Sequence, residues 1–132
     1  MNYMIENNSV EIRSEILHGF QRIVFSGELV YGQTEKIREE IFSLLVDCDG
    51  YILDLQNVKM IDSTGFGILV SIVKKLKNQN RIVVVINNPS ILQLFKITKL
   101  TLIFPVVETK EEAVALLSKD SEPPLGLSID DY

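Results

Sequence analysis

Residues 61–75 read IDSTGFGILVSIVKK, and this stretch decides how the chain around it folds. Asp62, Ser63 and Thr64 carry side-chain oxygens that can accept hydrogen bonds from the first N–H groups of a helix, so a helix is predicted to begin here. The apolar residues that follow recur at the spacing of one helical face, which predicts that the helix lies on a core. These residues are Ile68, Leu69, Ile72, Val73 and Leu76.

Two glycines fall in the opening turns of this predicted helix. Gly65 and Gly67 should each cost about 1 kcal/mol relative to alanine, so they suggest that another backbone approaches closely. A partner protein could then reach the Ser63 hydroxyl at the positive end of the helix dipole, where Phe66 and Val70 lie partly off the core-facing stripe. The same residues equally fit a plain structural role, in which the serine only caps the helix and the glycines only pack against a strand.

Strand patterns and helix patterns alternate along the rest of the chain. Alternating or continuous β-branched runs predict strands at residues 10–16, 20–26, 51–55, 82–86 and 101–107. Helical spacing predicts helices at residues 34–45, 63–76, 88–99 and 109–117. Together these patterns predict an α/β fold with a mixed β-sheet of about five strands and about four helices.

The connections between these elements indicate how the strands pair. The short turn at His18 and Gly19 predicts an antiparallel hairpin of the first two strands, and the later alternation predicts parallel crossovers. Residues 56–61 are predicted to be a loop that leads into the central helix. Pro105 lacks an N–H, so the last strand is predicted to lie at a sheet edge or to contain a bulge.

The length and composition indicate one globular domain. The chain has 132 residues, of which 46% are hydrophobic, so it can bury an ordinary core, and we expect the domain to span residues 1–118. Residues 119–132 are acidic and contain two adjacent prolines, so we expect a C-terminal tail that is mobile or loosely docked. Some apolar residues of the tail alternate weakly and could instead add to a sheet edge or a partner. They are Leu125, Leu127, Ile129 and Tyr132.

Charge, hydropathy and cysteine content argue against several classes of protein. A net charge of −5 lacks the positive field that nucleic-acid binding usually needs. The longest apolar run, residues 82–86, is far shorter than the roughly 20 residues that span a bilayer, and the N-terminus lacks a signal pattern. Cys48 is the one cysteine, which excludes an internal disulfide. We therefore expect a cytoplasmic protein that binds neither nucleic acid nor membrane.

One basic cluster stands out against this acidic background. It consists of Lys74, Lys75, Lys77 and Arg81. We interpret these cations as complementing the C-terminal end of the central helix dipole, and the alternative is a patch for an acidic partner.

The side chains that catalysis needs do not converge in this sequence. His18, the one histidine, lies in a predicted surface turn far in sequence from Ser63, so a Ser-His-Asp site is not expected. The chain has no G-x-S-x-G elbow and no phosphate-binding loop, and its acids are scattered over predicted helix surfaces. We expect no enzyme activity, cofactor or metal. A serine that other proteins could modify remains, which points to regulation.

Four segments resemble the STAS domain family, specifically the anti-sigma factor antagonists, also called anti-anti-sigma factors. DSTGFG at residues 62–67 is similar to the Asp-Ser-Ser/Thr-Gly-Leu-Gly signature of that family. The other segments are GEL at 27–29, LDL at 53–55 and LFKITKL at 94–100. The resemblance covers nearly the whole domain and implies a mixed sheet with helices packed mainly on one side.

The resemblance also implies a function in bacterial transcription regulation, in stress response or sporulation. Family members bind an anti-sigma factor that is also a GHKL-type serine kinase, and the sigma factor is released. The kinase phosphorylates the motif serine, and a PPM-type phosphatase restores it. The resemblance therefore implies that Ser63 is the acceptor, with Thr64 as second choice, and that Asp62 orients it. We expect such a protein to be a monomer or a weak dimer.

By the same resemblance, the partner is expected to contact the residues around the acceptor serine. These are Asp62, Thr64, Gly65, Phe66, Gly67 and Val70. Two positions depart from the family pattern. Val30 stands where the family often has an acidic residue, which puts a polar contact near the kinase interface in doubt. Phe66 replaces the motif leucine and enlarges the apolar spot.

Two other functions are compatible with these residues. The chain could be a STAS scaffold or adaptor subunit of a stressosome-like or lipid-transport assembly, in which case its mass in size-exclusion chromatography would be large. It could also be an enzyme with Ser63 as its own nucleophile, but the sequence offers no base to activate that serine.

Overall fold

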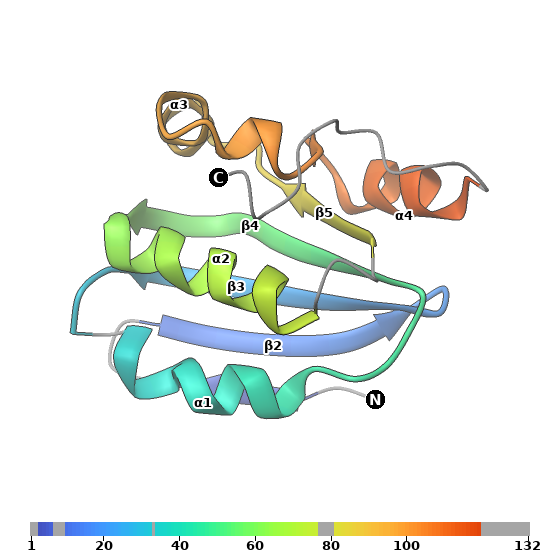
Figure 1. Cartoon of the computed structure of the whole chain (residues 1–132), viewed down its shortest axis with the longest axis horizontal. Coiled ribbons are helices and arrows are strands. Elements are labelled where there is room, and N and C mark those ends of the chain that lie inside the picture. Colours follow the sequence, from blue (N-terminus) through green and yellow to red (C-terminus); the bar gives the residue numbers. More distant parts are fainter. Residues whose placement is uncertain (1–2, 7–9, 33, 77–80, 120–132) are drawn as a thin grey trace.

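The architecture is a single mixed β-sheet with helices on both faces, seen in a computed structural model (Figure 1). The structure describes residues 3–6, 10–32, 34–76 and 81–119, and of residues 3–6 and 34–37 the backbone alone. The strands are β1 (Tyr3–Glu6), β2 (Val10–Leu17), β3 (Phe20–Leu29), β4 (Gly50–Ile61), β5 (Arg81–Val85) and β6 (Val106–Val107). The helices are α1 (Thr34–Leu44), α2 (Ser63–Leu76), α3 (Pro89–Ile97) and α4 (Lys110–Ser118), and a 3-10 turn spans Leu100–Leu102.

The strands lie in the order β1-β2-β3-β4-β5-β6, which combines two kinds of pairing. The first three strands pair antiparallel, and β3 to β6 pair in parallel. The turn between β2 and β3 contains His18 and Gly19, both with positive φ, as a tight hairpin requires. The predicted α/β fold with a mixed sheet is confirmed, although β1 brings the sheet to six strands.

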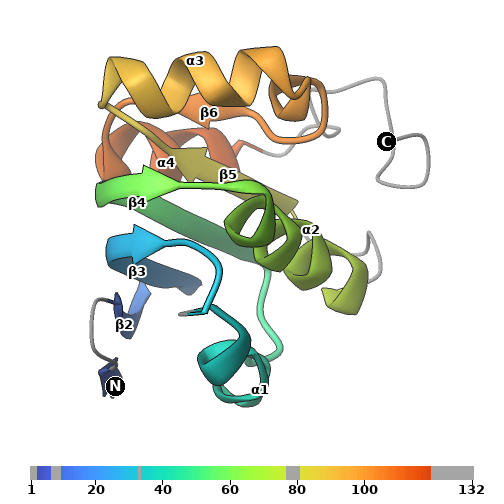
Figure 2. The same cartoon turned by 90° about the vertical axis from the view of Figure 1, so that its left-hand side faces the viewer.

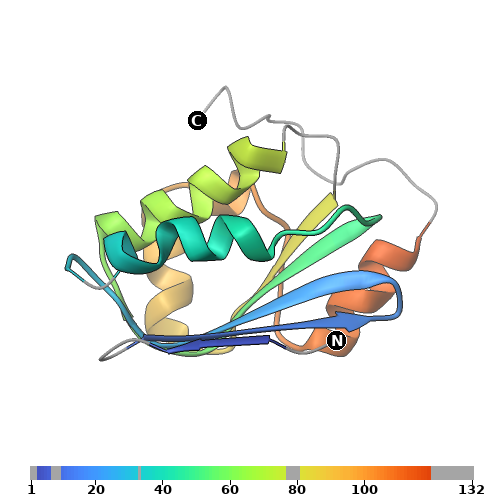
Figure 3. The same ribbon diagram turned by 90° about the horizontal axis from the view of Figure 1, so that it is seen from below.

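The helices divide unequally between the two faces of the sheet. α1 and α2 lie side by side on one face, and α4 lies on the other (Figures 2 and 3). α3 contributes Ile91 and Phe95 to the same core as α1 and α2, so most of the helices share one side, as expected. Among the described residues, none of the helices has the length and hydropathy of a membrane-spanning helix.

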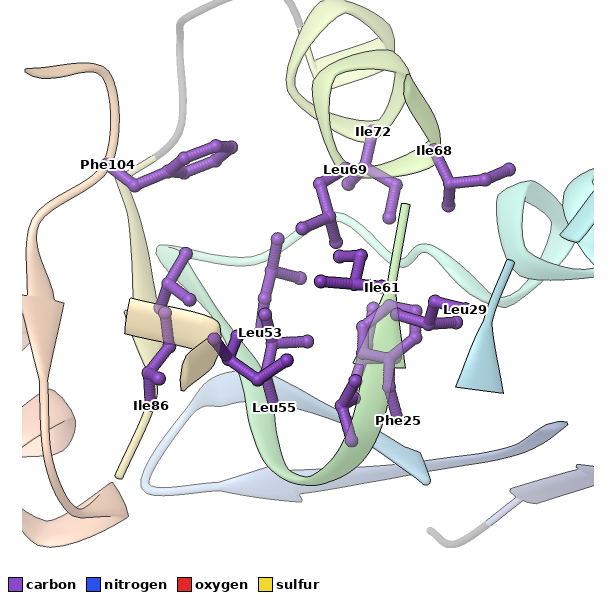
Figure 4. Packing of buried hydrophobic residues seen from close by; sticks show 14 of the residues in the cluster. Phe25, Leu29, Leu53, Leu55, Ile61, Ile68, Leu69, Ile72, Ile86 and Phe104 are labelled. Atoms are coloured by element: carbon purple, nitrogen blue, oxygen red, sulfur yellow. The ribbon is translucent and has the colours of Figure 1, made fainter. Parts of the chain in front are cut away.

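The main core lies between α2 and the centre of the sheet (Figure 4). Leu53 and Leu55 of β4 point toward α2, because alternate residues of a strand face the same side. Ile61, beyond the irregular part of β4, belongs to the same core. Leu69 and Ile72 of α2 are fully buried against them. Burial of one such side chain stabilises the fold by about 1.5–3 kcal/mol, so this seam fixes the position of α2 on the sheet.

Three sequence predictions of local structure differ from what is observed. Residues 56–61, predicted as a loop, are the second half of β4, where Val58 and Ile61 are buried and Lys59 and Met60 are exposed. β3 continues past the predicted end at Gly27 as far as Leu29, through irregular pairing with β4. The last strand is only Val106–Val107, because a 3-10 turn at Leu100–Leu102 precedes it.

A polar network is buried on the face of the sheet opposite α2. Asp54 of β4 is completely buried and accepts hydrogen bonds from Arg22 of β3, at 3.0 Å from Nε and 2.7 Å from Nη2. Arg22 also pairs with Glu15 of β2, and the Gln56 backbone N–H donates to Asp54 at 3.0 Å. Burial alone would lower the pKa of Arg22, but the bonds to the two carboxylates offset this and raise it. The network links three strands.

The C-terminal end of the domain is closed by α4. Thr109 and Glu112 form the predicted capping box, and Ala113 and Leu117 pack against the sheet. α4 ends at Ser118, next to the expected domain boundary. The expected tail lies outside the described residues except for Lys119.

Candidate functional site

The predicted motif lies at the carboxyl edge of the sheet, where β4 ends and α2 begins (Figure 1). Ile61, the last residue of β4, pairs with Leu29, the last residue of β3, so both strands end at the same level. The N–H of Asp62 donates to the carbonyl of Leu29 at 3.2 Å. This bond holds the first turn of α2 against the end of β3.

Asp62 caps α2 with its carboxylate. Oδ1 accepts from the N–H of Thr64 at 2.9 Å, from Thr64 Oγ1 at 2.6 Å and from the N–H of Gly65 at 3.2 Å. Oδ2 accepts from the N–H of Tyr31 at 3.0 Å, which ties the loop after β3 to the helix. Burial would raise the pKa of Asp62, but the bonds from Thr64, Tyr31 and Gly65 prevail and hold that pKa below its ordinary value.

Ser63 is the first residue of α2, and its side chain is exposed. The described hydrogen bonds of the Asp62 carboxylate go to Thr64, Gly65 and Tyr31, so the cap forms without the Ser63 hydroxyl. Thr64 is half-buried, and its hydroxyl is bonded to Asp62. Ser63 is therefore more accessible to a modifying enzyme than Thr64.

The two glycines of the motif have opposite surroundings. A Cβ on Gly65 would lie 2.3 Å from the carbonyl oxygen of Leu29 and 2.7 Å from Cγ1 of Ile61. Gly65 therefore meets a backbone inside the domain, at the end of β3. A Cβ on Gly67 would meet nothing within 4 Å, so packing within the described structure does not require that glycine.

Phe66 and Val70 are half-buried rather than open apolar contacts. The ring of Phe66 packs edge-on against Phe95 of α3, with the ring centroids 5.4 Å apart. Both residues also pack against the main core, so each offers only part of its side chain to a partner.

Two exposed apolar side chains at this edge were not singled out from the sequence. Tyr31, after β3, is 74% exposed, and Met60, near the end of β4, is 54% exposed. Tyr31 is bonded to Asp62 through its backbone, and Met60 lies two residues before Asp62. Both residues lie in segments that the sequence pattern predicts to be loops, where no periodicity marks an exposed apolar side chain. Val30, the departure from the family pattern, is half-buried beside Tyr31.

Catalytic and metal-binding groups are not gathered at this site. The described residues contain no group of three or more His, Cys, Asp or Glu side chains that could hold a metal ion. His18 lies in the turn before β3, whereas Ser63 lies beyond the carboxyl ends of β3 and β4, at the opposite edge of the sheet. The site presents the exposed Ser63 hydroxyl at a helix start that is capped by Asp62.

Comparisons with known proteins agree with this architecture. The family model described as STAS domain matches residues 11–113. No curated protein matches the sequence. Among solved structures, an anti-sigma factor antagonist from Mycobacterium paratuberculosis is similar with a TM-score of 0.78 at 23% identity, covering 86% of this chain and 98% of that one.

Two further similar structures are forms of one protein. The unphosphorylated form of the anti-sigma factor antagonist SpoIIAA has a TM-score of 0.66 at 20% identity and covers 84% of this chain and 99% of that one. The phosphorylated form of SpoIIAA, a Bacillus cell fate determinant, has a TM-score of 0.58 at 22% identity, with 80% and 98% covered. At these identities, the likeness shows a shared fold.

Proposed function

Because the chain belongs to the STAS domain family, we propose that it is an anti-sigma factor antagonist whose partner binding is controlled by phosphorylation of Ser63. In its unmodified form it binds an anti-sigma factor that is also a GHKL-type serine kinase, and the sigma factor is released. A PPM-type phosphatase reverses the modification. The proposal places this exchange in the bacterial cytoplasm.

The observation that carries the proposal is the accessibility of Ser63 on an already capped helix. Its side chain is exposed, and Asp62 occupies the N–H groups of Thr64 and Gly65. The carbonyl of Asp62 accepts from the N–H of Phe66 at 3.0 Å. A kinase can therefore reach the hydroxyl without opening the cap, and the modified helix keeps its start.

A phosphate on Ser63 acts mainly through charge. It adds about −1.5 to −2 charges beside the Asp62 carboxylate, at an edge that carries the exposed apolar side chains Tyr31 and Met60. The N-terminal end of a helix tolerates an anion, so the fold persists. A partner that buries this edge would have to desolvate the phosphate, so it binds the modified form more weakly.

The proposed contact surface follows from the same geometry. It comprises the motif residues Asp62, Thr64, Gly65, Phe66, Gly67 and Val70. The exposed Gly67 lets a partner backbone approach α2, and the outer parts of Phe66 and Val70 offer apolar contact. Tyr31 and Met60 extend this surface across the ends of β3 and β4.

Phosphorylation of the intact chain tests the assignment of the acceptor. The protein is incubated with its cognate GHKL-type kinase and ATP, and its intact mass is followed with time. We expect wild type to gain one phosphate and Ser63→Ala to gain none. Thr64→Val, which removes the bonded hydroxyl, serves as the matched variant and is expected to gain phosphate. Phosphate on Ser63→Ala at the wild-type rate would exclude Ser63 as the acceptor.

A further inference from the structure

The outward surface of α2 is a low strip that runs the length of the helix. Ser63, Gly67, Val70 and Lys74 follow one another at intervals of four, three and four residues, so they share one helical face. The first, second and last of these are exposed, and Val70 is half-buried. Because Gly67 has no side chain and open space above it, the middle of the strip can receive an extended chain.

Cations border this strip toward the C-terminal end of α2. Lys74 and Lys75 are exposed in the last turn. Arg38 of α1 donates from Nη2 to Ser71 Oγ at 3.3 Å, and its guanidinium lies 5.6 Å from the centroid of the Phe42 ring.

Lys75 approaches the same Phe42 ring, with Nζ 5.9 Å from its centroid. Within the part of the chain that the structure describes, salt bridges are found only at Arg22. Arg38, Lys74 and Lys75 therefore have no carboxylate partner there. Glu39 and Glu40 of α1 are displaced from Arg38 by about 100° and 200° around the helix, so neither lies on the same face of α1 as Arg38.

The chain itself contains a segment of complementary composition. Residues 120–132 include four acids and no lysine or arginine. The acids are Asp120, Glu122, Asp130 and Asp131, and between them lie the apolar residues Leu125, Leu127 and Ile129. The acids at its start, Asp120 and Glu122, suit the cations at the C-terminal end of α2, and the apolar residues that follow suit the surface at Val70.

This segment starts beside the C-terminal end of α2. Nη1 of Arg81 donates to the carbonyl of Lys119 at 2.9 Å, so residue 119 is held at the first residue of β5. α2 runs antiparallel to β4 and β5 in their crossover, so its last turn lies at this same edge of the sheet. The point of departure and the cations thus share one end of the molecule.

The segment is also long enough to follow the whole helix. α2 has 14 residues, which at about 1.5 Å per residue gives a length of about 20 Å. The thirteen residues 120–132 can span up to about 40 Å when extended, at about 3.3 Å per residue. The segment can therefore extend over the whole strip.

We propose that residues 120–132 dock along the outward surface of α2, with Asp120 and Glu122 on Arg38, Lys74 and Lys75 and the apolar residues over Gly67 and Val70. Tethering gives the segment an effective concentration on the order of millimolar, so weak contacts suffice. This docking does not rest on the proposed function.

Paramagnetic broadening in the full chain tests the docking without any partner. Cys48 is replaced by serine, which keeps a donor for the Gly50 carbonyl, and Ser128→Cys carries a nitroxide label. At low salt we expect the amide signals of Gly67, Val70 and Ser71 to lose about half of their intensity. The signals should recover near 1 M salt, where charges are screened beyond about 3 Å.

A pair of double variants with the same net charge provides the control. Lys74→Glu with Lys75→Glu should abolish the broadening, whereas Lys96→Glu with Lys110→Glu, away from the strip, should leave it unchanged. Equal broadening in both variants would overturn the proposal, as would broadening centred on Arg13 on the opposite face of the sheet. Broadening that persists between labelled and unlabelled copies in a mixture would assign the contact to a second copy and would also overturn it.

Discussion

Gly65 and Gly67 are both in α2, but Gly65 is buried against the sheet and Gly67 is exposed to solvent. A Cβ on Gly65 would collide with the carbonyl oxygen of Leu29 at 2.3 Å, whereas a Cβ on Gly67 would meet nothing within 4 Å. The two positions lie two residues apart in one helix, so backbone propensity affects them alike. Their difference comes from the sheet beneath Gly65.

Alanine substitutions at these two positions should have opposite effects on stability. Gly65→Ala forces α2 away from the end of β3, and we expect the free energy of unfolding to fall by about 1–3 kcal/mol. Gly67→Ala should leave that free energy unchanged or raise it by up to about 1 kcal/mol, because alanine favours a helix over glycine. Urea denaturation of both variants measures the difference. Equal destabilisation would show that α2 does not contact β3 as described.

Asp62 should make the stability of the domain depend on pH in the acid range. Its native pKa lies below the ordinary value of 3.8 because of the bonds from Thr64, Tyr31 and Gly65. The unfolded state therefore binds a proton first as the pH falls, and the stabilisation is complete above pH 3.8 and lost as the pH falls through the native pKa.

Denaturation at several pH values, compared with Asp62→Ala, isolates this contribution. The variant should lose about 0.5–2 kcal/mol at neutral pH through the missing cap. Below pH 3.8 the difference between the variant and wild type should shrink. A difference that stays constant down to strongly acid pH would mean that the carboxylate does not cap the helix in its ionised form.

Among the elements, the pairing of β3 with β4 depends on a buried ion pair as well as on the apolar core. Arg22 and Asp54 lie on adjacent parallel strands, and each is almost completely buried. Asp54→Ala would leave the guanidinium with Glu15 alone, and we expect a loss of about 3–5 kcal/mol in the free energy of unfolding. The double variant Arg22→Met, Asp54→Leu should recover much of that loss, because no buried charge then lacks its partner.

Thermal or urea unfolding of the single and double variants measures this coupling. Glu15→Gln is the matched control, because the Glu15 side chain is 27% exposed and can be hydrated. We expect that control to lose less than about 1 kcal/mol. If the double variant is as unstable as Asp54→Ala, the loss of stability in Asp54→Ala does not come from an unpaired charge on Arg22.

Elements with local signals could be predicted from the sequence, and those that depend on distant contacts could not. The start of α2 at Asp62 and the capping box of Thr109 and Glu112 involve bonds between residues at most three apart. Residues 56–61 adopt a strand because they pair with β3, about thirty residues away, and irregular pairing there obscures the alternation of side chains. β6 is short because Leu100 and Phe104 turn into the core before it.

At the site, too, features with a local sequence signal could be predicted, and contacts between distant residues could not. The position of Ser63 at a helix start and the half-burial of Val70 follow from helical spacing. The contact of Phe66 with Phe95 joins two helices, and Tyr31 reaches Asp62 across a crossover. Neither contact leaves a periodic trace in the sequence.

In the whole molecule, the two ends of α2 lie at opposite edges of the sheet and differ in charge. Its first turn lies at the carboxyl edge of the sheet with Ser63, Tyr31 and Met60, and its last turn carries Lys74 and Lys75 at the opposite edge. The proposed phosphate on Ser63 would change the net charge from −5 to about −7, and the added charge would lie at the first edge. A change of charge at one edge can therefore alter partner binding while the core stays unchanged.

Binding of the anti-sigma factor to the chain with and without phosphoserine at position 63 tests this most directly. Phosphoserine is incorporated site-specifically, so no kinase is needed, and isothermal titration calorimetry gives the two dissociation constants. We expect the modified chain to bind at least about tenfold more weakly, a loss of about 1.4 kcal/mol, with an unchanged unfolding transition. Equal affinity of the two forms for the anti-sigma factor would contradict the account.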